Sequence, residues 1–213
     1  MYKPHPSDEL RQHFAERPYQ GADPMAAKLL FVGLDANYDE AIAKSPAFTS
    51  VLEYHQDGVA FWRRYGVHHP FLLPYYRGDG RRYHQTFAKI GFQPDHAHLV
   101  SFVELLHLPT VGRSQLVPAD LDSCHVKWLD NVIRAGEAQH IFVSAGVLRL
   151  MQSTDQFHWL RGGHTPVDSL PVLYDDGRRK IYRHLHFSNY GKFQAQLERE
   201  RMHIGALLSL SSS

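Results

Sequence analysis

The chain has 213 residues and a formal net charge of +1, and 43% of its residues are hydrophobic. This is enough for one buried core and excludes a disordered chain. No apolar run approaches the roughly 18 residues of a membrane span, and the N-terminal sequence MYKPHPSDEL does not resemble a signal peptide. The single cysteine, Cys124, excludes an internal disulfide and a four-cysteine metal centre. We therefore expect a cytoplasmic monomer with no membrane partner, no metal or iron–sulfur cluster and no cofactor.

Four apolar segments predict strands. They are residues 28–35, 98–105, 140–146 and 180–186. The first three are nearly continuous apolar runs, which is the pattern of parallel strands buried on both faces. The fourth follows residues 170–174 across the turn sequence Asp175-Asp176-Gly177, and this arrangement predicts a hairpin.

Helical patterns alternate with these strands. They cover residues 46–65, 81–90, 118–135, 147–160 and 191–210. The third has Asp120 and Asp122 at its start and Gly136 at its end, which are typical helix boundary signals. The alternation predicts an α/β fold, a three-layer α/β/α sandwich around a mostly parallel four-stranded sheet. We expect one domain over residues 1–213, with residues 207–213 as a frayed tail.

Ligands of open parallel sheets bind beyond the carboxyl ends of the strands. In this chain that rule selects residues 35–38, 104–110, 146–147 and 186–192. Two of these loops carry a reactive group directly after a strand, namely Asp35 and His186. Gly33 would allow the backbone to approach a ligand, and the backbone N–H groups at the helix start after His186 could hold an anion such as a phosphate group.

Several motifs resemble, in the same order, those of the uracil-DNA glycosylase superfamily. GLDANY (33–38) resembles the strand-end motif Gly-x-Asp-Pro-Tyr-His, and HFSNYGKF (186–193) resembles His-Pro-Ser-Pro-Leu. Between them, RRYHQTFAKIGF (81–92) and FVELLHLPT (102–110) are similar to segments of the mismatch-specific thymine/uracil DNA glycosylases, the closest pattern. IFVSAGVLRL (141–150) has the expected strand–Gly–helix shape. The resemblance covers residues 28–193.

The resemblance implies a monofunctional DNA N-glycosylase active in base excision, with DNA containing the target base as its partner. Asp35 and His186 would then be the catalytic residues. The residues implied to bind the base are Gly33, Leu34, Asn37, Tyr38, Phe71, Ser101 and Glu104. Those implied to contact DNA are Arg81, Arg82, Ser188, Asn189, Tyr190 and Lys192, with Tyr190 at the position of the wedge that fills the gap left by a flipped nucleotide.

The chain also departs from the family's pattern. Ala36, Phe187 and Asn189 stand where the motifs carry prolines, and the second strand has no asparagine to read uracil. Residues 39–80 form an insertion rich in aromatic side chains, which could widen the pocket. The substrate is therefore open between a deaminated or mismatched base and a modified one, including hypermodified, phage-type cytosine.

Three other interpretations remain. The chain could be a catalytically silent member that binds DNA or a modified nucleotide, or a hydrolase of free nucleosides or small esters. His184 and His186 alternate onto one strand face and could form a metal pair, but no cysteine or carboxylate stands at ligand spacing. Basic residues gather at positions 63–64, 77–82 and 178–183. These clusters either face DNA phosphates or are solvated loop charges.

Overall fold

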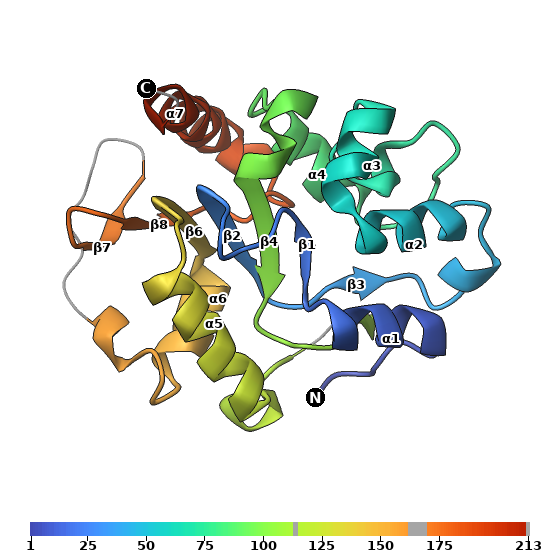
Figure 1. Cartoon of the computed structure of the whole chain (residues 1–213), viewed down its shortest axis with the longest axis horizontal. Helices are drawn as coiled ribbons and strands as arrows, with labels where there is room; N and C mark the ends of the chain where they lie inside the picture. The colour runs from blue at the N-terminus through green and yellow to red at the C-terminus, as the bar shows by residue number, and fades with distance from the viewer. Residues whose placement is uncertain (113–114, 162–169, 212–213) are drawn as a thin grey trace.

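The computed structural model describes residues 1–112, 115–161 and 170–211 (Figure 1). Its main feature is a six-stranded mixed sheet with the strand order β1-β4-β2-β6-β8-β7. The strands are β1 (Tyr19–Gly21), β2 (Leu29–Gly33), β4 (Val100–Glu104), β6 (His140–Ser144), β7 (Val172–Asp175) and β8 (Lys180–His184). Two shorter strands, β3 (Asn37–Tyr38) and β5 (Thr110–Val111), pair with each other.

The four strands predicted from the apolar runs lie side by side and parallel at the centre of this sheet. The prediction of a four-stranded sheet is nevertheless wrong, because β1 and β7 add one antiparallel strand at each edge. β7 belongs to the predicted hairpin with β8. β1 has three residues, which is too short to show a period-two pattern in the sequence.

Seven α-helices occur among the described residues. They are α1 (Asp8–Glu16), α2 (Phe48–Gln56), α3 (Gly58–Tyr65), α4 (Arg81–Ala88), α5 (Ser123–Ala135), α6 (Ala145–Gln152) and α7 (Gln194–Ser211). Single 3₁₀ turns cover Ile42–Lys44, Pro70–Leu72, Pro94–Leu99, Pro118–Asp120, His158–Arg161 and Gly191–Phe193. Parts of the helices predicted at 118–135, 147–160 and 191–210 are therefore 3₁₀ turns or loops.

The helix predicted over residues 46–65 is divided into α2 and α3 at Asp57. The Asp57 carboxylate accepts a hydrogen bond from the backbone N–H of Ala60 at 2.9 Å and so caps the start of α3. Gly58 lies against the backbone of Gly21, where an added Cβ would come within 2.7 Å of the Gly21 nitrogen. The break therefore lets the insertion pack closely on strand β1.

Helices cover both faces of the sheet (Figure 1). On one face, α5 and α6 enclose strand residues such as Leu30, Val103 and Ile141. On the other face, side chains of α3, α4 and α7 pack on an aromatic cluster that includes Phe31 and Phe142. Strand residues that alternate along the chain thus point into two different cores, as the apolar runs predict.

The C-terminal helix α7 extends through Ser211. Leu207 and Leu208 are buried in the same core as Phe31, so the prediction of a frayed tail from residue 207 is wrong at these positions. Residues 212–213 lie outside the described part of the chain. None of the helices in the described ranges combines the length and the apolar character that a membrane crossing requires.

The segments that leave β2 and β4 continue side by side beyond the sheet. The backbone N–H groups of Leu105 and Leu106 donate to the carbonyls of Gly33 and Leu34, each at 3.0 Å. The N–H of Thr110 then donates to the Ala36 carbonyl at 2.9 Å, where β3 and β5 begin to pair. This pairing holds the side chains that follow the two strands over one end of the sheet.

Candidate active site

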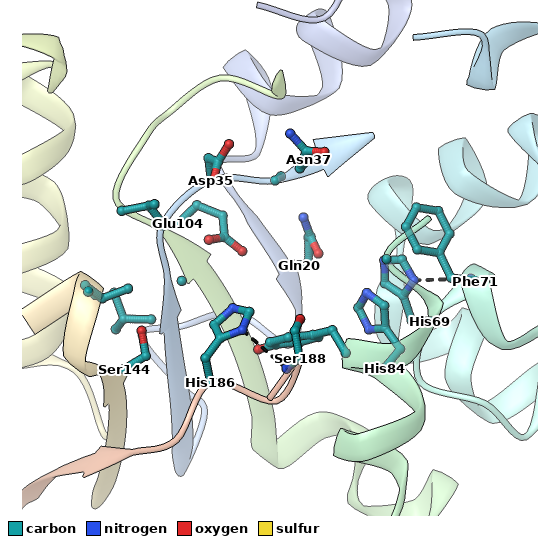
Figure 2. A pocket seen from close by; sticks show the side chains of 18 of the residues that line it. Gln20, Asp35, Asn37, His69, Phe71, His84, Glu104, Ser144, His186 and Ser188 are labelled. Carbon is teal, nitrogen blue, oxygen red and sulfur yellow. Dashed lines mark hydrogen bonds between the residues drawn. The ribbon is translucent and has the colours of Figure 1, made fainter. Parts of the chain in front are cut away.

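A cavity of about 460 Å³ lies at the carboxyl ends of the parallel strands (Figure 2). Each of the four loops selected by the strand-end rule contributes to its lining, through Asp35, Glu104, Gly146 and His186. Nine of the predicted site residues line it: Gly33, Leu34, Asp35, Asn37, Tyr38, Phe71, Glu104, His186 and Ser188. A pocket of this size is in the range of small-molecule sites.

Asp35 and His186 lie on the same cavity although 151 positions separate them in the sequence. Asp35 follows β2 and His186 follows β8, with β6 between these two strands. Two strand spacings, about 10 Å, therefore lie between the strand ends that carry them. Desolvation lowers the pKa of His186, and the charge of Asp35 acts in the opposite direction, which is the expected effect of a carboxylate on the same cavity as an imidazole.

Asp35 is positioned by Thr110, the first residue of β5. The Thr110 hydroxyl donates a hydrogen bond to Asp35 Oδ2, and the Asn37 side-chain amide donates to Thr110 Oγ1 at 3.0 Å. The Asn37 amide also donates to the Gly112 carbonyl. Asn37 thus uses its N–H groups to hold strands β3 and β5 together, which differs from its predicted role in binding the base. Thr110 is not among the predicted site residues, although Pro109-Thr110 belongs to one of the segments that carry the resemblance.

His186 carries a neutral imidazole whose tautomer is set by the next turn of the chain. The backbone N–H of Ser188 donates to His186 Nδ1 at 3.3 Å, so the ring proton resides on Nε2. Desolvation lowers the pKa of His186 and outweighs the opposite effect of Asp35. The ring of Tyr83 packs against it with 5.2 Å between centroids. The arrangement presents an N–H donor without a full positive charge.

Glu104 ends strand β4, and its carboxyl group lies over Gly33. In the register of the sheet these two residues are directly opposite each other. A Cβ on Gly33 would lie 1.9 Å from Glu104 Oε2. This glycine therefore makes room for the Glu104 carboxyl group, whereas the sequence analysis expected it to make room for a ligand. Burial raises the pKa of Glu104 to about 8, and the charge of Asp35 acts in the same direction.

A second wall of the cavity comes from the insertion and from α4, and sequence analysis missed most of it. Figure 2 shows His69, Phe71 and His84 together on one side, away from Asp35 and Glu104. The imidazoles of His69 and His84 are stacked at 3.5 Å with 6° between their planes. Burial lowers the pKa of both histidines well below its usual range, so both rings are neutral. Gln20 of β1 also lines the cavity.

Two residues predicted to bind the base have other surroundings. Ser101 is completely buried and shares its strand face with Val103, on the side of α5 and α6. It does not line the cavity, so its predicted role is wrong. Tyr38 reaches the cavity but is 4% exposed, and its hydroxyl is hydrogen-bonded to His55 Nε2 at 2.7 Å. Its ring is therefore mainly part of the core beneath the insertion.

The residues predicted to contact DNA lie at or near the outer edge of the site. Tyr190 is 69% exposed, and the Arg82 guanidinium lies 4.6 Å from the centre of its ring. Arg81 donates a hydrogen bond to the Tyr76 carbonyl at 2.7 Å, which anchors the start of α4. The N–H of Asn189 donates to the His186 carbonyl at 2.9 Å, and Lys192 lies over the ring of Phe193. Tyr190 and Arg82 are thus the exposed pair beside the cavity.

The basic cluster at 178–183 has a structural role instead. Arg178 and Arg179 donate hydrogen bonds to the Gly136 and Ile133 carbonyls at the end of α5. Lys180 forms an ion pair with Asp175 at 3.0 Å. Because these charges complement the carboxyl end of a helix and a neighbouring carboxylate, they stabilise the edge of the sheet.

The cavity combines a carboxylate held by a hydroxyl group with a neutral N–H donor on the opposite side. Such a pair can stabilise positive charge at one end of a breaking bond and negative charge at the other. Among residues 1–112, 115–161 and 170–211, no group of three or more His, Cys, Asp or Glu side chains is placed to hold a metal ion. In comparisons with known proteins, the chain matches no protein-family model, and no curated protein is similar to it in sequence.

Proposed function

We propose that this protein is a monofunctional DNA N-glycosylase that hydrolyses the bond between a pyrimidine-type base and deoxyribose. The observation that carries the proposal is the position of Asp35 and His186 on one cavity at the strand ends. In the reaction, the C1′–N1 bond breaks and the base leaves with the electron pair. A water oxygen bonds to C1′, and the proton lost from water balances the charge of the departing base.

Asp35 would act on the sugar side of this reaction. As the bond breaks, positive charge develops on the sugar, and a carboxylate below it stabilises that charge and orients the attacking water. The hydrogen bond from Thr110 keeps the carboxylate in one orientation before the substrate arrives. Such preorganisation is the main source of electrostatic catalysis, because no reorganisation is needed during the reaction.

His186 would act on the base side. Its Nε2–H can donate to a base oxygen as negative charge develops there, while Nδ1 is held by the N–H of Ser188. A neutral imidazole suits this role because its N–H matches a weakly basic oxygen and transfers no proton to it too early.

The base must leave the stack of a duplex before it can enter the cavity. Tyr190, exposed and close to Arg82, would fill the space left by the flipped nucleotide and stack on its neighbours. Ser188 and Lys192 lie on the same loop and could contact the adjacent phosphates.

A second candidate substrate is hypermodified cytosine, as in phage-type DNA. It is favoured by the wall of His69, Phe71 and His84, which enlarges the cavity away from Asp35. His69 and Phe71 belong to residues 39–80, the region that the family's pattern does not include. The neutral imidazoles of this wall and the Gln20 amide are suited to a polar, uncharged substituent on the base.

The experiment that tests the function is an excision assay with a panel of duplexes. The duplexes carry uracil, a mismatched thymine, 5-hydroxymethyluracil, or 5-hydroxymethylcytosine with and without an attached sugar, and each is heated in alkali after incubation. We expect strand scission at one or more marked bases with wild-type protein and none with Asp35→Asn. Tight binding without scission would identify a silent binding protein. Release of base from free nucleosides at a rate equal to that from DNA would identify a nucleoside hydrolase.

A further inference from the structure

In the part of the chain that the structure describes, two acidic side chains line the cavity, Glu104 and Asp35, and their surroundings differ. Its carboxyl group lies over Gly33 at the floor of the pocket, and among the described residues none donates a hydrogen bond to it. Asp35, by contrast, accepts from Thr110. Polar side chains that are largely removed from solvent normally form hydrogen bonds within the protein. A carboxyl group without such a bond is available to form hydrogen bonds with a ligand.

We propose that Glu104 recognises the flipped pyrimidine by pairing, as a neutral carboxylic acid, with its position-3 nitrogen and its position-4 group. This inference rests on the proposed function and names the part of the base that the site reads. In this role Glu104 takes the place of the asparagine that the resemblance leads one to expect on the second strand and that this strand lacks.

The chemistry of a carboxylic acid fits this edge of both pyrimidine types. Cytosine presents an amino donor at position 4 and an acceptor at position 3, whereas uracil and thymine present an acceptor at position 4 and an N–H at position 3. A neutral carboxyl group has one donor and one acceptor side by side, so it can form two hydrogen bonds with either edge. A carboxylate has acceptors alone and would leave one base acceptor facing a negative charge.

The groups around Glu104 keep it in the neutral form. The titratable groups that interact electrostatically with Glu104 are Asp35, Tyr38, Tyr54 and Tyr83, and those that line the same cavity from other elements are His69, His84, His184 and His186. The tyrosine pKa values are raised and those of the four histidines are lowered, so these groups are uncharged near neutral pH. The charge of Asp35 opposes ionisation of Glu104, whose pKa burial raises to about 8.

The test compares Glu104→Gln with Glu104→Ala. An amide keeps one donor and one acceptor in the shape of a carboxylic acid but does not ionise, whereas alanine removes both. The matched control is Glu9→Gln on the exposed face of α1. Binding is measured with duplexes that carry a 2′-fluoroarabino pyrimidine nucleotide, because the fluorine slows cleavage and separates recognition from catalysis.

We expect wild-type affinity to fall about tenfold per pH unit above about pH 8, because each unit then removes most of the remaining neutral acid. Glu104→Gln should bind as tightly as wild type at pH 7, within about threefold, and lose this pH dependence. Glu104→Ala should bind about 10- to 100-fold more weakly at every pH, as expected for loss of a bidentate contact to a base. Glu9→Gln should match wild type throughout.

A second readout does not depend on DNA. In protein labelled with ¹³C at the glutamate carboxyl carbons, one resonance that is absent from Glu104→Gln should titrate near pH 8. Two results overturn the inference: a Glu104 resonance that titrates below about pH 6, or duplex binding that Glu104→Gln and Glu104→Ala weaken equally. In either case, excision by the wild-type protein would still support the glycosylase activity. If binding and titration are as expected but no base is excised, the proposed glycosylase activity is overturned and the proposed pairing of Glu104 with the base stands. An analogue duplex that binds no better than unmodified DNA overturns the pairing.

Discussion

The cavity has two walls that differ in origin and in chemistry. The strand-end wall consists of Asp35, Glu104 and His186, which follow or end parallel strands of the central sheet. The insertion wall consists of His69 and Phe71 from the insertion and His84 from α4, whose rings are stacked or packed edge to face and carry no charge. The first wall has groups that can stabilise charges, and the second has surfaces that can contact a flat or substituted ring.

In the proposed enzyme the catalytic side chains, Asp35 and His186, belong to the strand-end wall, and recognition of the base is divided between Glu104 and the insertion wall. The strand ends are fixed by backbone pairing in the sheet, so groups placed there keep their geometry through a reaction. The insertion wall is held by side-chain packing, which includes the stack of His69 on His84. We therefore expect variants of Asp35 and His186 to change the rate for all substrates, and variants of the insertion wall to change which substrate is preferred.

The largest effect is expected for Asp35→Asn. This substitution keeps the shape of the side chain and removes the negative charge that stabilises the sugar cation. Single-turnover excision should fall by about 10³-fold with every cleavable base, while affinity for the duplex changes little. Asp39→Asn, a neighbour outside the cavity, serves as the control. A fall of less than about tenfold for Asp35→Asn would remove Asp35 from the reaction.

A smaller but still general loss is expected for His186→Ala. Without the Nε2–H donor, single-turnover excision should fall by about 10²-fold. His186→Gln keeps a side-chain N–H and should recover part of the rate, whereas a merely structural role would leave both variants equally impaired. Rates of the two variants are compared on the same duplex, with thermal unfolding measured for each. Equal rates for wild type and His186→Ala would contradict the role.

The strand-end wall could be predicted because its signals are local. An apolar run followed directly by Asp35 or His186 marks a strand end, and the carboxyl ends of parallel strands meet on one edge. The alternation of side chains along a strand also excludes Ser101 from the cavity that Glu104 lines. Ser101 and Glu104 are three residues apart on one strand, and side chains an odd number of positions apart point to opposite faces.

The insertion wall could not be predicted in the same way. His69 of the insertion stacks on His84 of α4, and the insertion packs on β1 through the close contact of Gly58 with Gly21. The three residues of β1 carry no recognisable pattern in the sequence. Contacts of this kind are decided by packing between segments far apart in the sequence, and residue patterns along the chain do not encode them individually.

His84→Ala tests whether the insertion wall selects the substrate. Removing this ring opens the stack on His69, and excision of a 5-substituted base should fall about tenfold relative to excision of unsubstituted uracil. His84→Phe keeps a ring and tells stacking apart from hydrogen bonding, and His98→Ala, on an exposed position, is the control. An equal loss on both substrates would place His84 with the strand-end wall and break the comparison.

The smallest effect is expected at the outer rim, where Tyr190 contributes to neither wall. It is 69% exposed and packs against the guanidinium of Arg82, so its removal should leave the core and the cavity intact. A stacked aromatic ring is worth about 1–3 kcal/mol per base, and Tyr190→Ala should therefore weaken duplex binding about tenfold or more. Excision from a single strand, which needs no wedge, should change much less, and Tyr190→Phe should resemble wild type on both substrates.

Tyr75→Ala, which alters an exposed tyrosine that does not line the cavity, is the matched control. Binding by fluorescence anisotropy and single-turnover rates on single- and double-stranded substrates give the two measurements. If Tyr190→Ala impaired both substrates equally, the residue would act on the cavity rather than on the gap in the duplex, and the rim would have to be counted as part of the reacting wall.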